Sequence, residues 1–209
     1  LSHARAILSF SGLAPGNDET LWELRNEDMR PRELIEDLPE DALTYVPPRA
    51  LILREQVVQT ALRSAGRGSA PDLSVTRYEH SPVLMEDETA WFEFRRLIQD
   101  IARAEVLADI LPCLRLGRMT ALRKDNGRDR GIVAGSVLRR LACKAVAQQY
   151  SSELLRVTEP LQYALSTRAG RDAYAVRFLL EADPQRVMVS LDGVGAFDHI
   201  RKAQFLRKL

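Results

Sequence analysis

The segment that most constrains the fold is a run of apolar and basic residues over 113–124, followed by Asp-Asn-Gly at 125–127 and a second extended run over 128–135. Alternation of this kind favours a half-buried strand, because successive side chains of a strand point to opposite faces. Asp, Asn and Gly supply the chemistry of tight hairpin turns. The segment therefore predicts a β-hairpin with a basic exposed face, and Ser136 can cap a helix over about 137–155.

Helical periodicity dominates much of the remaining chain. Further helices are predicted over 20–30 with a cap at Asn17 or Asp18, and over 31–38, 49–63, 88–110, 170–182 and 196–209. Residues 64–71 have the Gly, Ser and Pro content of a linker, so we place a domain boundary there. The aromatic cluster Trp91, Phe92 and Phe94 favours core packing over base stacking.

The two halves of the chain carry opposite charge. Residues 1–110 hold 12 Lys and Arg against 20 Asp and Glu, whereas residues 111–209 hold 18 against 9. Nine cations lie in one stretch of the basic half: Arg115, Arg118, Arg123, Lys124, Arg128, Arg130, Arg139, Arg140 and Lys144. Such density suits phosphate contacts, because each neutralised phosphate releases counterions. A solvated basic face, or attraction between the two halves of the protein, are the alternative interpretations.

Composition excludes several classes of protein. Cys113 and Cys143 lie at no metal-like spacing, which argues against a disulfide scaffold and a zinc site. Their use fits a reducing compartment, so we expect an intracellular location, nuclear or cytoplasmic. The three histidines are scattered. No apolar run is long enough to span a bilayer, so we expect no membrane partner. The chain starts at Leu1 and stops inside a helical pattern, and we expect it to be a fragment of a longer polypeptide.

A β-branched apolar run over 187–191 ends in Asp192 and is followed by Gly193 and Gly195. A carboxylate at a strand end can point into a cleft and hold Mg²⁺, which prefers oxygen ligands. A turn-forming Asp-Gly is the alternative interpretation. The third glycine of a dinucleotide fingerprint and the Gly-Lys-Ser/Thr end of a Walker A motif are both absent. An aspartyl-phosphatase pattern fails because position 194 is Val rather than Asp.

Four segments in series resemble the reverse transcriptase (RNA-directed DNA polymerase) of non-LTR, LINE-type retrotransposons. The first segment resembles the fingers hairpin of that family and comprises Arg118–Lys124, Asn126-Gly127 and Arg130-Gly-Ile. The second, Ser136–Lys144, resembles the helix that follows this hairpin. Pro160-Leu-Gln-Tyr with Gly170 resembles the "P-x-Q-x-G … G" segment, and Leu191–Asp198 the first palm motif, "D-x-x-x-A-F". The resemblance implies an α+β fold, the fingers and partial palm of a right-hand polymerase over 111–209. A helical lead-in over 71–110 and a mostly helical region of unknown role over 1–70 would precede it.

The resemblance also implies roles for matching residues, with two Mg²⁺ ions as cofactor and RNA template, DNA primer and dNTP as partners. The catalytic Asp192 would bind both metal ions, together with the Gly193 carbonyl. Lys124 and Arg130 would bind the triphosphate of the incoming nucleotide, and the backbone of Gly195 and Ala196 would lie near it. Phe197 would exclude a 2′-OH and so select deoxynucleotides. From the density of cations, and not from the resemblance, the other seven are expected to contact nucleic acid: Arg115, Arg118, Arg123, Arg128, Arg139, Arg140 and Lys144. Most of the binding and catalytic set therefore falls on the hairpin and on the stretch around Asp192.

Two departures from the family pattern matter. Gly131 stands where the family has proline, which predicts a looser return strand. The second palm motif, an adjacent Asp pair, does not occur in these 209 residues. Because one carboxylate cannot hold two Mg²⁺ ions, we expect this fragment to be inactive in DNA synthesis. The alternatives are a non-catalytic nucleic-acid-binding module from a decayed retroelement, and a structural fragment with no activity of its own.

Overall fold

A computed structural model describes residues 12–31, 38–124, 126–159, 162–163, 169–180 and 201–207 of the chain. The chain divides into two compact units built from interleaved segments. Unit 1 comprises residues 1–50, 118–134 and 191–209, and unit 2 comprises residues 51–117 and 135–190. The stretch 64–71, predicted as a linker, lies inside unit 2.

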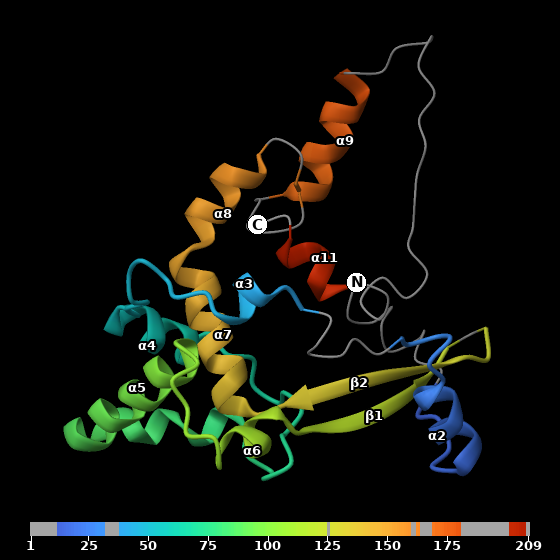
Figure 1. The fold of residues 1–209 in the computed structure, drawn as a ribbon, viewed down its shortest axis with the longest axis horizontal. Helices are drawn as coiled ribbons and strands as arrows, with labels where there is room; N and C mark the ends of the chain where they lie inside the picture. The colour runs from blue at the N-terminus through green and yellow to red at the C-terminus, as the bar shows by residue number, and fades with distance from the viewer. Residues whose placement is uncertain are drawn as a thin grey trace. The chain divides into compact units, whose positions relative to one another are not determined.

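The predicted hairpin is confirmed. Strands β1 (Gly117–Arg123) and β2 (Asp129–Gly135) form a two-stranded sheet (Figure 1). The first strand begins at Gly117 and not near residue 113 as predicted, because the preceding residues form a short helix, α6 (Leu111–Arg115). Proline in the first turn of α6 favours that helix, since it has no N–H to lose there.

The hairpin turn is tied by two backbone hydrogen bonds. The Lys124 N–H donates to the Arg128 carbonyl at 2.8 Å, and the Gly127 N–H donates to the Lys124 carbonyl at 2.9 Å. Gly127 has φ +78°, a left-handed conformation that glycine adopts without a steric cost. This pattern matches a hairpin loop in which a left-handed glycine forms a bulge, and it fixes which residues face each other across the strands.

Helix α2 (Asp18–Arg25) packs beside this hairpin within unit 1. Asn17 caps it, as predicted, by accepting from the Thr20 N–H at 3.0 Å, but the helix ends five residues before the predicted Arg30. The Glu23 carboxylate accepts from the Asp129 N–H at 2.8 Å. A bridge between Leu13 and Leu122 covers the other edge of the hairpin, along β1. Unit 1 also contains the short helices α3 (Glu40–Leu43) and α11 (Lys202–Leu206).

Three helices form the core of unit 2: α4 (Glu55–Arg63), α5 (Glu88–Ala102) and α7 (Val137–Gln149). Their buried side chains are Val58, Ala61, Leu62, Trp91, Phe94, Ile98, Leu141, Ala142 and Ala145. Burial of Trp91 and Phe94 confirms the predicted core role for two of the three aromatics, whereas Phe92 is 55% exposed.

Several predicted helix limits in unit 2 were wrong. Helix α4 begins at Glu55 and not near residue 49. Helix α5 stops at Ala102, well before residue 110, because Ala104 takes φ +59° and ends the helical path. The helix predicted over 137–155 breaks at Tyr150 into α7 and α8 (Ser151–Thr158).

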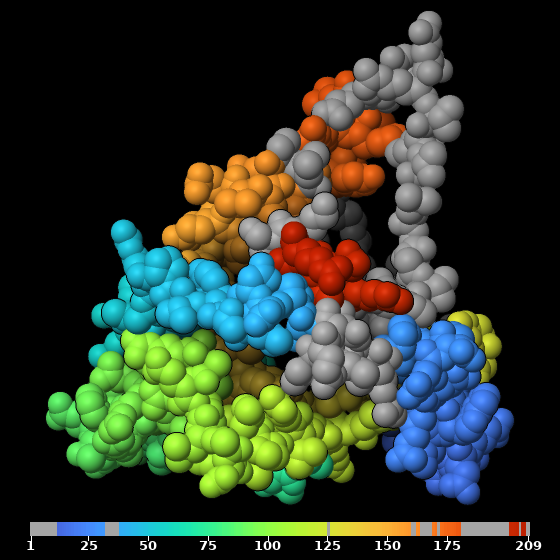
Figure 2. Space-filling model, in the orientation of Figure 1, coloured from blue at the N-terminus to red at the C-terminus, as the bar shows by residue number. Residues whose placement is uncertain are grey.

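The last described helix of unit 2 is α9 (Gly170–Leu180), and it matches the helix predicted over 170–182. Two short 3₁₀ turns, η2 (Tyr78–His80) and η3 (Pro82–Glu86), precede α5. The prediction for 31–38 falls largely outside the described residues, whereas 201–207 of the helix predicted over 196–209 is described and contains α11. Helices α8 and α9, orange in Figure 2, expose large apolar side chains, among them Val157 and Leu179.

Helix α7 is capped from a distance. Ser136 occupies the cap position, but its side chain makes no capping hydrogen bond. Instead the buried Asp72 carboxylate accepts from the Val137 N–H at 3.0 Å, and it also accepts from the Ser74 and Thr76 N–H groups. A carboxylate at a helix N-terminus accepts hydrogen bonds from free N–H groups and interacts favourably with the positive end of the helix dipole. Asp72 therefore ties the loop before η2 to the start of α7.

Candidate nucleic-acid interface

Four basic side chains share one face of the hairpin. The Lys124–Arg128 pair sets the register, so Leu122 lies opposite Arg130 and Arg118 lies opposite Ala134. Because side chains alternate between faces along a strand, one face carries Arg118, Lys124, Arg128 and Arg130, which we call the basic face. All four residues are exposed. The other described positions on this face are Thr120, Leu122, Ile132 and Ala134, none of them acidic.

Lys124 and Arg130 are diagonal neighbours on the basic face. Diagonal pairs across two antiparallel strands are separated by roughly 7–8 Å, within reach of long side chains. Both residues are exposed, so the two charged groups can bind a single polyphosphate. These are the two hairpin residues to which the resemblance assigns the triphosphate.

Arg123 lies on the opposite face of the hairpin. Its Nε is 2.9 Å from Oδ1 of Asp129, whose side chain is only 1% exposed, and its Nη1 donates to the Gly127 carbonyl at 3.0 Å. The Asp129 Oδ1 accepts no well-aligned hydrogen bond, so the contact is an ion pair without directional bonding. The charge of Arg123 is thus engaged inside the hairpin and is not part of the basic face.

Replacing Arg123 with alanine is expected to destabilise the hairpin by about 1–3 kcal/mol, because the buried Asp129 carboxylate would lose its cation. Amide hydrogen exchange of the strand residues measures this change. Arg118→Ala is the matched control, since it removes the same charge from the exposed basic face, and it should cost less than about 0.5 kcal/mol. Equal losses in the two variants would contradict a structural role for Arg123.

The remaining predicted cations belong to unit 2. Arg115 is exposed at the end of α6, whereas Arg139, Arg140 and Lys144 on α7 are half-buried. Arg140 donates to the Ala70 carbonyl at 2.9 Å and lies 5.0 Å from the centre of the Tyr78 ring. The Arg139 guanidinium lies against Gly135, where a side chain would collide with it. Burial lowers the pKa of Lys144.

The palm residues singled out by the sequence lie outside the described residues. These are Asp192, Gly193, Gly195, Ala196 and Phe197. Among the residues that are described, no group of three or more His, Cys, Asp or Glu is placed to hold a metal ion. No helix in that part of the chain is long and apolar enough to cross a membrane.

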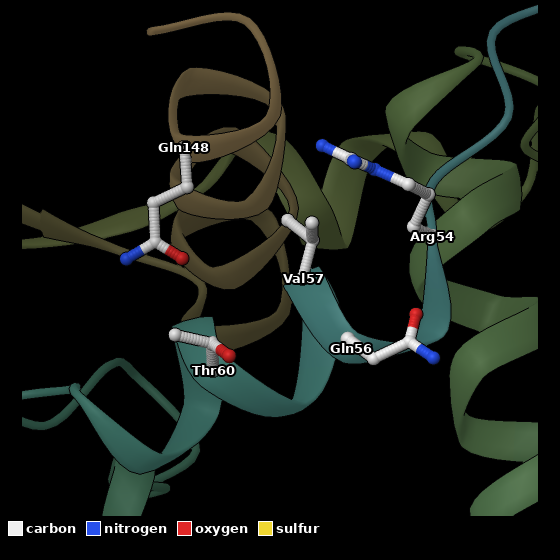
Figure 3. Close-up of a pocket in the computed structure, with 5 residues that line it drawn as sticks. All are labelled: Arg54, Gln56, Val57, Thr60 and Gln148. Carbon is white, nitrogen blue, oxygen red and sulfur yellow. The ribbon is translucent and has the colours of Figure 1, made fainter.

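Among the described residues of unit 2, two shallow hollows lie away from the predicted site residues. One, of about 370 Å³, lies between α4 and α7 and is lined by Arg54, Gln56, Val57, Thr60 and Gln148 (Figure 3). The other, of about 380 Å³, lies at the start of α5, where Arg95 pairs with Glu55 at 2.9 Å and sits over the Trp91 and Phe92 rings. In the second hollow, the Glu55 carboxylate also accepts from the Trp91 Nε1 at 2.9 Å.

The sequence did not lead us to expect the structural roles of Asp129, which pairs with Arg123, and of Asp72, which caps α7. The signal for Asp129 is its place between Arg128 and Arg130, since alternation puts it on the opposite face from both. No local signal marks Asp72, whose partner Val137 lies 65 residues further along the chain. Comparison with known proteins found no matching family model, no matching curated protein and no matching solved structure.

Proposed function

We propose that this chain is the fingers and first palm segment of a reverse transcriptase, and that the basic face binds nucleic-acid and nucleotide phosphates. The observation that carries the proposal is the sharing of one exposed face by Arg118, Lys124, Arg128 and Arg130. Phosphate binding by such a face gains from counterion release, and arginine offers a planar fork to phosphate oxygens. The four segments that resemble the polymerase family support assigning the basic face to the fingers of such an enzyme.

Nucleotidyl transfer relies on positioning and charge neutralisation more than on covalent help from the protein. In this proposal Lys124 and Arg130 hold the triphosphate, while the template lies along the other cations. Asp192 and the Gly193 carbonyl would hold Mg²⁺, which supplies neutralisation of the charge that develops on the transferred phosphate. DNA synthesis needs a second carboxylate motif, which these 209 residues do not contain.

A non-catalytic nucleic-acid-binding module is the second candidate. The basic face favours it equally, because binding a polyanion requires no carboxylate at all. The two functions differ in whether Asp192 binds a catalytic metal. Both predict RNA binding by the basic face, which one binding measurement tests. Only the polymerase function predicts primer extension, which a separate activity measurement tests.

The binding measurement follows the affinity for single-stranded RNA against salt concentration. If four cations neutralise phosphates, the logarithm of affinity should fall against the logarithm of salt with a slope of roughly −3, and Lys124→Ala with Arg130→Ala should bring it to roughly −1.5. Arg63→Ala with Arg67→Ala is the matched control, since both residues are exposed in unit 2 and the net charge changes equally. A flat salt dependence, or an equal effect of the control, would contradict the proposal.

The activity measurement uses a chain lengthened at its C-terminus to include an adjacent Asp pair. There Asp192→Ala should abolish primer extension while leaving template affinity unchanged, because it removes a metal ligand and no phosphate contact. Extension that persists in the variant would overturn the metal role of Asp192. RNA binding without extension in the unmodified longer chain would favour the binding module.

A further inference from the structure

We propose that the outer edge of β2, at Gly131 and Val133, is a docking site for an extended acidic segment of a partner protein, which adds to the sheet as a strand. This proposal does not depend on the polymerase function. It uses main-chain groups at the edge of the hairpin, whereas the proposed function uses side chains on its basic face.

The hairpin register decides which main-chain groups face outward. In an antiparallel pair, the N–H and C=O groups of every second residue point away from the partner strand. On β1 these are the groups of Gly117, Met119, Ala121 and Arg123. The Ala121 carbonyl accepts from the Ala14 N–H at 3.0 Å and the Arg123 N–H donates to the Gly12 carbonyl at 3.1 Å, so the half of this edge nearer the turn is occupied.

On β2 the outward residues are Asp129, Gly131, Val133 and Gly135, of which Gly135 is buried at the end of the strand. Asp129 is satisfied, because its N–H donates to Glu23 at 2.8 Å and its carbonyl accepts from Arg30 Nη2 at 3.1 Å. Gly131 and Val133 make no hydrogen bond at this edge to any described residue. Four main-chain donors and acceptors are thus left in a row, which is the template that an added strand uses.

The side chains around this row suit an added strand. Ile132 is 45% exposed and Val133 is 56% exposed, and they lie on opposite faces of the hairpin. Apolar side chains of an added strand could therefore pack beside Val133, on the face opposite the basic face. Gly131 has no side chain, and a Cβ there would lie 3.3 Å from Leu24 Cδ2, so α2 covers this position on the face opposite the basic face while the main-chain groups of Gly131 stay at the strand edge.

Charge selects an acidic occupant. Every second side chain of an added strand would lie beside the basic face, next to Arg130, and no described acidic residue lies on that face. Directly opposed unlike charges stabilise strand pairing and like charges oppose it. A second copy of this chain would bring another basic face alongside, whereas a strand with alternating Glu and Val would pair its carboxylates with these cations.

The test uses the acetylated peptide Glu-Val-Glu-Val-Glu-Val and amide exchange of this chain measured residue by residue. Bound peptide should slow exchange at Gly131 and Val133 by about tenfold or more, because their N–H groups acquire partners. Ile132, whose N–H already pairs with β1, should change little. The same peptide with N-methyl groups at alternate residues should not bind, since it lacks the donors of a strand.

Val133→Pro is the matching change in the protein. It removes one outward N–H, and proline is tolerated on an edge strand, so we expect the hairpin to persist and peptide affinity to fall about tenfold or more. Val133→Thr keeps the N–H and a β-branched side chain and should bind the peptide normally. RNA affinity should be the same in both variants, which separates this site from the basic face.

Three outcomes would overturn the proposal. A Lys-Val peptide of equal length that binds as tightly would remove the charge argument. Protection of Gly131 and Val133 that grows with protein concentration in the absence of peptide would assign the edge to a second copy. If Val133→Pro and N-methylation of the peptide leave its affinity unchanged, the peptide binds to the basic face alone and not to the strand edge.

Discussion

Ile98→Ala is expected to lower the free energy of unfolding of unit 2 by about 3–4 kcal/mol. Ile98 is fully buried in α5, within the cluster shared by α4, α5 and α7. Its truncation loses apolar burial and leaves a cavity that three packed helices cannot close completely. Urea unfolding followed by circular dichroism measures the change, provided that the slope of the transition stays the same.

Leu97→Ala is the matched control for this variant. Leu97 is the preceding residue of the same helix and is 43% exposed, so its truncation removes apolar atoms without creating a cavity. We expect it to cost about 1 kcal/mol or less. If the two variants lose equal stability, α5 does not pack through the face that contains Ile98.

Asp72→Ala is expected to destabilise the same unit by about 2–3 kcal/mol. The change removes the acceptor of the Val137 N–H, a buried bond of 3.0 Å, together with bonds from the Ser74 hydroxyl at 2.6 Å and from two backbone N–H groups. A buried N–H left without a partner carries a full desolvation cost. Asp87→Ala is the control, because Asp87 caps α5 from an exposed position with one bond, to Ala90 at 2.7 Å, and should cost about 1 kcal/mol.

Asp72 also gives the stability a pH dependence. Burial raises the pKa of Asp72, but hydrogen bonds from Ser74, Val137 and Thr76 outweigh it and hold that pKa below its ordinary value. The folded pKa is thus lower than the unfolded one, so the stabilisation is complete above about pH 4 and is lost as pH falls through the folded value. Asp72→Asn should therefore be less stable than the unmodified protein at pH 7 and approach it in acid. A constant difference across that range would exclude this linkage.

The hairpin was predictable because its signals are local. Residues 125–127 mark the turn, and the β-branched and small residues of 128–135 mark the return strand. Which cations share a face was not predictable, because that depends on the bulge at Gly127 and on where β1 begins. Alternation read from residue 113 continues through α6, where a strand period has no meaning. Within β1, alternation separates Arg123 from Arg118, whereas Arg115 lies in α6 and alternation does not place it.

The cap of α7 shows the same limit. The serine at position 136 marked the start of the helix correctly, since a small polar residue fits the backbone conformation there. The group that accepts from the first helical N–H comes from Asp72, through tertiary contact alone. A sequence pattern within one helix carries no information on a partner so far away along the chain.

The interleaving of the two units has a consequence for synthesis on the ribosome. Leu13 pairs with Leu122, so the first segment of unit 1 emerges long before the hairpin that completes it. Residues 51–117 of unit 2 are made in between, and their helices α4 and α5 in turn wait for α7. Neither unit can form its packing contacts until a later segment of the same unit has been translated. Contacts between residues so distant in sequence also slow folding. The nascent chain therefore presents α2 and the apolar face of α5 to the cell before either has its partner.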